Sequence, residues 1–117
     1  MPGGAAEDAV AARLVDEGWI VLDRRLRIGR LEVDVLAQKK DVVAIVEVRG
    51  RRIDGLVSAI DSIDWQKKRH LQKAARTLFS RRFAKDTSVR VIRIDVATVT
   101  FGPGEPTIEI FEGAVDL

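Results

Sequence analysis

The sequence predicts an α/β fold in which a helix precedes three strands and a second helix precedes two more. Three strand patterns follow one another with turns of two or three residues between them, which is typical of an antiparallel meander. A long helical pattern then separates the third strand from the fourth, so the chain can cross over and pair the fourth strand parallel to a meander strand. We therefore expect a mixed sheet with an extra C-terminal strand. A chain of 117 residues fits a single domain spanning residues 1–117.

The first half of the chain supplies the first helix and the meander. Residues 5–17 carry apolar residues at helical spacing, and Gly18 follows as a stop signal. Residues 19–28 have the pattern of a strand that becomes polar towards its end, and residues 31–38 alternate with a period of two. Residues 42–49 (VVAIVEVR) form an almost continuous β-branched run. Such a run predicts a strand buried on both faces.

The second half supplies the crossover helix and two strands. Residues 50–55 form a basic loop bounded by glycines, and residues 57–80 form a long helical pattern, with a break expected near residues 61–64. Residues 88–99 are the next predicted strand. After a Gly-Pro-Gly turn, residues 107–111 predict a short final strand.

The composition excludes several kinds of chemistry. The chain has no cysteine, which excludes disulfides, zinc fingers, iron–sulfur clusters and thiol catalysis. Its single histidine, His70, excludes a histidine-cluster metal site. Carboxylates and cations remain for any chemistry. The sequence has neither a signal peptide nor an apolar run of about 20 residues that could span a bilayer, so we expect a soluble cytoplasmic protein.

Charge is strongly segregated along the chain although the formal net charge is only +2. Residues 65–93 contain ten basic residues and one acidic residue, a net charge of +9, whereas residues 94–117 carry five acids and no cation. A basic block of this density is typical of a protein that binds a phosphate backbone. The same block also fits a solvated helix face followed by a basic turn. The acidic segment leaves open a third possibility, a subunit that acts through protein contacts.

Three carboxylates occupy positions where apolar side chains would be expected. Asp34 and Glu47 lie in neighbouring predicted strands, each flanked by apolar residues. Buried carboxylates are costly unless they are paired or bind metal, and two of them can converge on one divalent cation. The alternative is an ion pair with Arg49. Glu7 shares the apolar stripe of the first helix, although a Glu in a first turn also complements the helix dipole.

The long helix carries a lysine in its apolar stripe. At 100° per residue, Ile63, Leu71 and Leu78 lie within 40° of Lys67. Stripe lysines often extend along apolar surface to reach solvent, but an ammonium facing acidic strands could stabilise phosphoryl-transfer chemistry. We expect Trp19 and Trp65 to be core or interface anchors rather than base-stacking platforms, because the six aromatic residues form no repeated pattern.

Five short blocks in the same order resemble the YraN-like family of uncharacterised bacterial proteins. They are Glu7 with Leu14 and Gly18, the block 27–36 (RIGRLEVDVL), the block 46–51 (VEVRGR), the helix positions Lys67, Leu71, Ala74 and Ala75, and the block 93–96 (RIDV). The fold of that family is similar to the fold of Holliday-junction resolvases in the PD-(D/E)XK nuclease superfamily. The resemblance implies a restriction-endonuclease-like αβββαβ core.

The resemblance also implies a site. Asp34 and Glu47, with the Val48 carbonyl, would hold Mg²⁺ or Mn²⁺, and Glu7 would assist. Arg49 stands where the superfamily has its catalytic lysine. Since arginine does not lose its proton in proteins, it could stabilise charge but not act as a base, and Lys67 is the candidate replacement.

Two functions from different classes follow from these residues. The first is a metal-dependent endonuclease that acts on structured or branched DNA. The second is a catalytically degenerate module that binds nucleic acid without cutting it. For either function, the expected nucleic-acid-binding residues are Arg51, Arg52, Lys68, Arg69, Lys73 and Arg76. By analogy with junction resolvases, a homodimer would suit a two-fold substrate.

Overall fold

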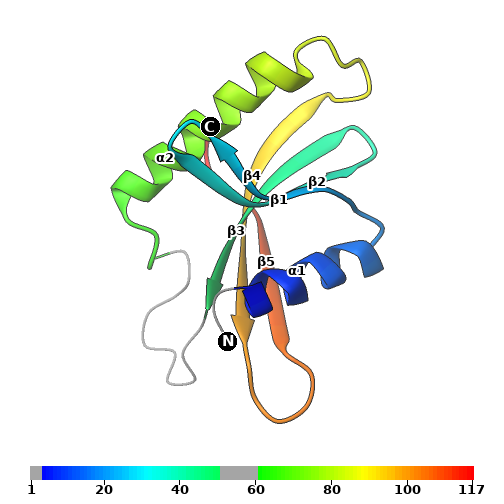
Figure 1. Ribbon diagram of the computed structural model, residues 1–117, viewed down its shortest axis with the longest axis vertical. Helices are drawn as coiled ribbons and strands as arrows, with labels where there is room; N and C mark the ends of the chain where they lie inside the picture. Colours follow the sequence, from blue (N-terminus) through cyan, green and yellow to red (C-terminus); the bar gives the residue numbers. More distant parts are fainter. Residues whose placement is uncertain (1–3, 51–60) are drawn as a thin grey trace.

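A computed structural model describes residues 4–50 and 61–117. The elements along the chain are α1 (Gly4–Asp16), β1 (Ile20–Ile28), β2 (Leu31–Lys39), β3 (Val42–Gly50), α2 (Trp65–Leu78), the π-helical turn η1 (Phe79–Phe83), β4 (Val91–Thr100) and β5 (Thr107–Val115). The five strands form one sheet in the order β1-β2-β3-β4-β5 (Figure 1). Strands β3 and β4 are parallel, and the other neighbouring strands are antiparallel. The predicted element order, the mixed sheet and the extra C-terminal strand are confirmed.

The two helices cover different faces of the sheet. Val10 and Leu14 of α1 belong to one buried cluster, which includes Val46 of β3. Leu71 of α2 belongs to a second cluster, which includes Ile45 of the same strand. Since successive strand residues point to opposite faces, β3 is buried on both sides, as its β-branched sequence predicts. Neither helix in the described part of the chain is long and apolar enough to cross a membrane.

The break expected near residues 61–64 is confirmed, since residues 61–63 are turn and bend and α2 begins at Trp65. Asp64 caps the helix, because its Oδ1 accepts a hydrogen bond from the Lys67 N–H at 2.8 Å. The predicted helix start at residue 57 falls in residues 51–60, which lie outside the described part of the chain. One predicted boundary was wrong. The final strand extends to Val115 instead of ending at 111.

The sheet forks on the side where β3 ends. Strand β2 pairs with β3 from Lys39 only as far as the Val35–Val46 pair. Beyond that pair β2 continues along β1 to Leu31, while β3 continues along β4 to Gly50. In Figure 1 the β1–β2 hairpin runs towards α2, and β3 runs beside β4 in a different direction. Asp34 and Glu47 are the first residues past the last β2–β3 pair.

Candidate metal and nucleic-acid site

Asp34 and Glu47 face the same side of the sheet at the fork. Leu36 pairs with Ile45, whose side chain packs in the α2 cluster, and Asp34 and Glu47 each lie two residues beyond that pair. Strand alternation therefore places both carboxylates on the α2 side. Oδ2 of Asp34 accepts a hydrogen bond from the Val48 N–H at 2.8 Å. A side chain thus replaces the backbone partner at the point where the two strands separate.

Glu47 is buried and incompletely paired. Its residue is 4% exposed, and its Oε1 makes no hydrogen bond with any described residue. Nζ of Lys67 lies 3.6 Å from Oε1, and Nε of Arg49 lies 3.2 Å from Oε2. Burial, reinforced by the nearby charge of Asp34, raises the pKa of Glu47 to about 7, although Lys67 and Arg49 act in the opposite direction.

The pKa of Asp34 is also raised. Burial raises its pKa, and the charge of Glu7 adds to this effect. The Val48 N–H and the Lys67 ammonium stabilise the ionised form and oppose the rise. The charge of Asp34 therefore disfavours the ionisation of Glu47, whereas a hydrogen bond from Glu47 favours the ionised form of Asp34. A divalent cation between the two would favour the ionised forms of both.

Lys67 reaches this site from α2, as the helical phase predicts. It lies in the first turn of the helix, held there by the Asp64 cap. Leu71, Ala74 and Leu78 on the same face are buried against the sheet. The lysine side chain is half-buried, with its ammonium directed at Glu47.

Glu7 lies in the first turn of α1 and is held by a cation from β1. Its Oε1 accepts a hydrogen bond from Nε of Arg25 at 2.7 Å. Arg25 has a φ of 51°, a left-handed conformation that is uncommon outside glycine and interrupts the regular strand. The charge of Glu7 influences Asp34. Both interpretations of Glu7 remain compatible with this position, since it combines a first-turn carboxylate with proximity to the site.

The donor set fits a hard divalent cation with few protein ligands. Within residues 4–50 and 61–117, no three His, Cys, Asp or Glu side chains gather closely enough to hold a metal ion between them. Asp34 and Glu47 therefore supply two carboxylates. The C=O of a strand residue points to the same side as its N–H, so the Val48 carbonyl also faces the fork. Mg²⁺ accepts one or two carboxylates and completes its shell with water and phosphate oxygens, and the unsatisfied Oε1 of Glu47 is a suitable ligand atom.

Comparison with known proteins places the chain in a family. Residues 6–99 match the uncharacterised protein family UPF0102. The chain belongs to UPF0102. It is 43% identical over 113 residues to a UPF0102 protein of Sorangium cellulosum, covering 96% of this chain and 78% of that protein. It is 36% identical over 115 residues to a UPF0102 protein of Myxococcus xanthus, covering 97% and 88%. The YraN-like part of the predicted resemblance is thereby confirmed.

The basic residues of this UPF0102 chain divide into paired and unpaired groups. Lys67, Arg82, Arg90 and Arg93 form ion pairs with acidic side chains. The α2 cations Lys68, Arg69, Lys73 and Arg76 form no ion pair with any described residue. Arg69, Lys73 and Arg76 are exposed and Lys68 is half-buried. Arg51 and Arg52 lie outside the described part of the chain. Most of the positive charge of residues 65–93 that is not paired with a described acidic residue therefore lies on α2.

The two tryptophans of this UPF0102 chain differ in burial. Trp19 is buried in the core, whereas Trp65 is 70% exposed, which excludes the core role and leaves the predicted interface role untested. Its helical phase gave the signal, since Trp65 lies on the opposite side of α2 from Lys67 and four residues before Arg69. The break expected near residues 61–64 also places Trp65 at the start of the helical segment that follows.

Proposed function

We propose that this protein is a metal-dependent endonuclease that acts on structured or branched DNA by phosphodiester hydrolysis. One observation carries the proposal: the buried, incompletely paired Glu47 and the half-buried Asp34 lie together at the fork of the sheet, with Lys67 directed at Glu47. A buried carboxylate with an unsatisfied oxygen is costly, and a divalent cation would remove that cost. The cytoplasmic location expected from the sequence and a possible homodimer belong to the same proposal.

Each residue has a defined task in this proposal. Asp34, Glu47 and the Val48 carbonyl would hold Mg²⁺ or Mn²⁺, which supplies a Lewis acid and an activated water at neutral pH. Lys67 and Arg49 form ion pairs with Glu47, and they would stabilise the negative charge that develops on the phosphate. Glu7 would add negative charge near Asp34. Arg69, Lys73 and Arg76, with Lys68, Arg51 and Arg52, would bind the DNA backbone.

A specific contact favours a second candidate, a nucleic-acid-binding module without turnover. Both Arg49 and Lys67 already contact Glu47. These two cations partly neutralise the carboxylate charge of Glu47 that would attract a metal ion. Arg49 also cannot act as a base. In this case the fold and the basic helix would be kept for binding while the chemistry is lost.

A cleavage panel separates the two candidates. Junction, flap, single-strand and duplex DNA are incubated with Mg²⁺ or Mn²⁺ and wild-type protein, and we expect cleavage of a structured substrate. Asp34→Ala and Glu47→Ala should lower the rate by more than about 100-fold, and a chelator should abolish cleavage. No cleavage of any substrate with either metal would refute the nuclease proposal.

Two further variants test which positively charged side chain, Lys67 or Arg49, takes part in cleavage. Lys67→Ala should abolish cleavage if Lys67 replaces the superfamily lysine. Activity that appears only in Arg49→Lys would instead identify a degenerate site and support the binding module. Glu32→Gln, an exposed acid on β2 outside the site, serves as the control and should cleave at the wild-type rate.

Binding is tested separately without metal. Replacing Lys73 and Arg76 together by Gln should weaken duplex binding and reduce the slope of log K against log salt by about 2. The control pair Arg13→Gln and Lys40→Gln removes two charges from α1 and from the β2–β3 turn. An equal change in both pairs would show that overall charge, not the α2 surface, determines binding.

A further inference from the structure

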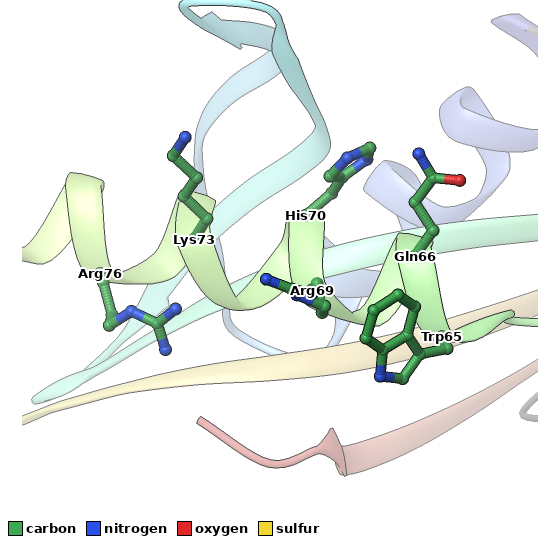
Figure 2. A pocket seen from close by; sticks show the side chains of 6 residues that line it. All are labelled: Trp65, Gln66, Arg69, His70, Lys73 and Arg76. Carbon is green, nitrogen blue, oxygen red and sulfur yellow. The ribbon is translucent and has the colours of Figure 1, made fainter.

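A tryptophan stands exposed at the start of the basic helix. Trp65 is the first residue of α2 and is 70% exposed. Leu71 and Ala74 of the same helix are buried against the sheet, whereas the indole of Trp65 lies outside the helix beside Arg69 (Figure 2). A large aromatic ring that is exposed to solvent and surrounded by polar and charged groups is typical of a binding site.

Arg69 fixes one face of this ring. Its Cζ lies 4.7 Å from the centre of the indole, a cation–π contact between residues four apart on one helix face. Figure 2 shows the guanidinium and the indole side by side at the start of α2. The contact holds the indole in one orientation and places a positive charge against it, while the high exposure leaves ring surface open to a ligand.

The tryptophan lines a hollow whose lining, among residues 4–50 and 61–117, contains cationic but no acidic side chains. The hollow has a volume of about 390 Å³ and is lined by Trp65, Gln66, Arg69, His70, Lys73 and Arg76. A second hollow of about 330 Å³ shares Lys73 and Arg76 and continues to Arg81. A ligand that matches this surface has a flat aromatic group at one end and several negative charges along the rest. A nucleic-acid strand with an unpaired base has both.

The same helical turn connects the hollow to the candidate site. Asp64 caps α2 through the Lys67 N–H, so one turn of about 5.4 Å carries Trp65 on its outer side and Lys67 on its inner side. Lys67 contacts Glu47. A strand that follows the basic face of α2 towards its N-terminus therefore reaches the indole in the same helical turn as Lys67, on the opposite side of the helix from the carboxylates.

We propose that Trp65 is a stacking platform for an unpaired DNA base, with Arg69, Lys73 and Arg76 binding the phosphates of the same strand. The identity of the ligand as DNA rests on the proposed function. The inference narrows the substrate class to DNA with single-stranded nucleotides beside the cleavage site. Base–aromatic stacking tolerates any sequence, because every base has a π-face.

The test compares single-stranded and duplex binding in chelator, so that cleavage cannot interfere. A 20-nucleotide oligo-dT and a 20-base-pair duplex are titrated against wild type, Trp65→Ala and Trp65→Phe. We expect Trp65→Ala to weaken oligo-dT binding by roughly tenfold or more and duplex binding by less than about twofold. Trp65→Phe, which keeps an aromatic face, should recover much of the affinity. Phe101→Ala removes an exposed aromatic ring at the end of β4 and should change neither affinity.

Several outcomes would overturn the proposal. Equal losses for both DNA forms, or no loss, would show that Trp65 does not read unpaired bases. A loss confined to an oligo-U RNA control would assign the platform to RNA. A change of oligomeric state in Trp65→Ala by light scattering, with DNA binding unchanged, would assign the indole to a protein interface. Thermal unfolding verifies that each variant is folded.

The outcome is independent of the nuclease proposal. Selective loss of oligo-dT binding in a protein that cuts nothing would support the platform and refute the endonuclease. Metal-dependent cleavage of a flap by Trp65→Ala with wild-type rate and affinity would refute the platform and leave the endonuclease intact.

Discussion

The sheet contains two kinds of buried carboxylate, and they lie on opposite faces. Asp95 of β4 is 1% exposed, and its two oxygens accept hydrogen bonds from Nε and Nη2 of Arg93 at 2.8 and 2.9 Å and from the Gly113 N–H at 2.9 Å. Glu47 of β3 is almost as buried, but its Oε1 has no hydrogen bond with a described residue. Burial alone therefore does not distinguish a structural carboxylate from a candidate ligand, whereas hydrogen bonding does.

The surroundings of Asp95 explain its structural role. The β4–β5 register shifts between Ile94 and Val96, and Gly113 opposite this irregularity has a φ of 62°. Asp95 accepts the N–H of Gly113, as Asp34 accepts the N–H of Val48 where β2 and β3 separate. In both places a carboxylate accepts a backbone hydrogen bond at a point where the pairing of two neighbouring strands is interrupted. Only at the fork are two carboxylates left facing each other.

The largest expected effect concerns Asp95, the carboxylate with a structural role. Asp95→Asn should lower the free energy of unfolding by about 3 kcal/mol, because it breaks a buried, bidentate pair and leaves Arg93 with only the exposed carboxylate of Glu112 among the described residues. Urea unfolding at pH 7 measures the loss. DNA cleavage or binding per folded molecule should remain within about twofold of wild type. A large loss of function at full stability would mean that Asp95 also serves the site.

The next effect concerns the pH dependence of the metal-free protein. The pKa of Glu47 is raised from 4.5 to about 7, so the folded state binds this proton more tightly than the unfolded state. The resulting stabilisation is complete below pH 4.5 and is lost as the pH rises through 7, on the order of 3 kcal/mol in total.

The matched variant for this prediction is Glu47→Gln. Its unfolding free energy, measured in chelator between pH 5 and 8, should lack the decline attributed to Glu47 and should exceed that of wild type at pH 8. Identical pH profiles for the two proteins would show that Glu47 ionises normally.

The smallest effect isolates Lys67. Lys67→Met removes a cation that lowers the pKa of Glu47, so the midpoint of the pH-dependent decline should move to higher pH. Because the lysine is partly exposed, its contribution to stability at pH 8 should be under about 1 kcal/mol. The exposed Lys73→Met on the outer side of the helix should leave the midpoint unchanged. Equal shifts in both variants would point to general charge effects.

Much of this arrangement follows from local patterns in the sequence. The β-branched run 42–49 predicts a strand buried on both faces, and period-two alternation places Asp34 and Glu47 on the α2 side of their strands. The inward direction of Lys67 follows from counting 100° per residue. These features depend only on spacing within single elements, which the sequence contains in full.

Other features depend on contacts between distant residues. Nothing within residues 46–49 reveals that β2 leaves β3 after Val46, and that separation decides which carboxylates stay unpaired. Asp95 and Glu47 look alike in sequence, each one residue from valine in an apolar strand. The exposed position of Trp65 is different, because it follows from a local contact, the side-chain cap at Asp64 that begins α2.

Cation binding measured by calorimetry tests the central distinction between the two carboxylates most directly. Mn²⁺ is titrated into wild type, Glu47→Gln and Asp95→Asn at pH 8 and at pH 6. We predict one Mn²⁺ per chain in wild type and Asp95→Asn, with weaker binding at pH 6 because a proton competes for Glu47. Glu47→Gln should bind at least about tenfold more weakly at pH 8. Absence of Mn²⁺ binding by wild type, or equal binding by Glu47→Gln, would contradict the assignment of the fork as a metal site.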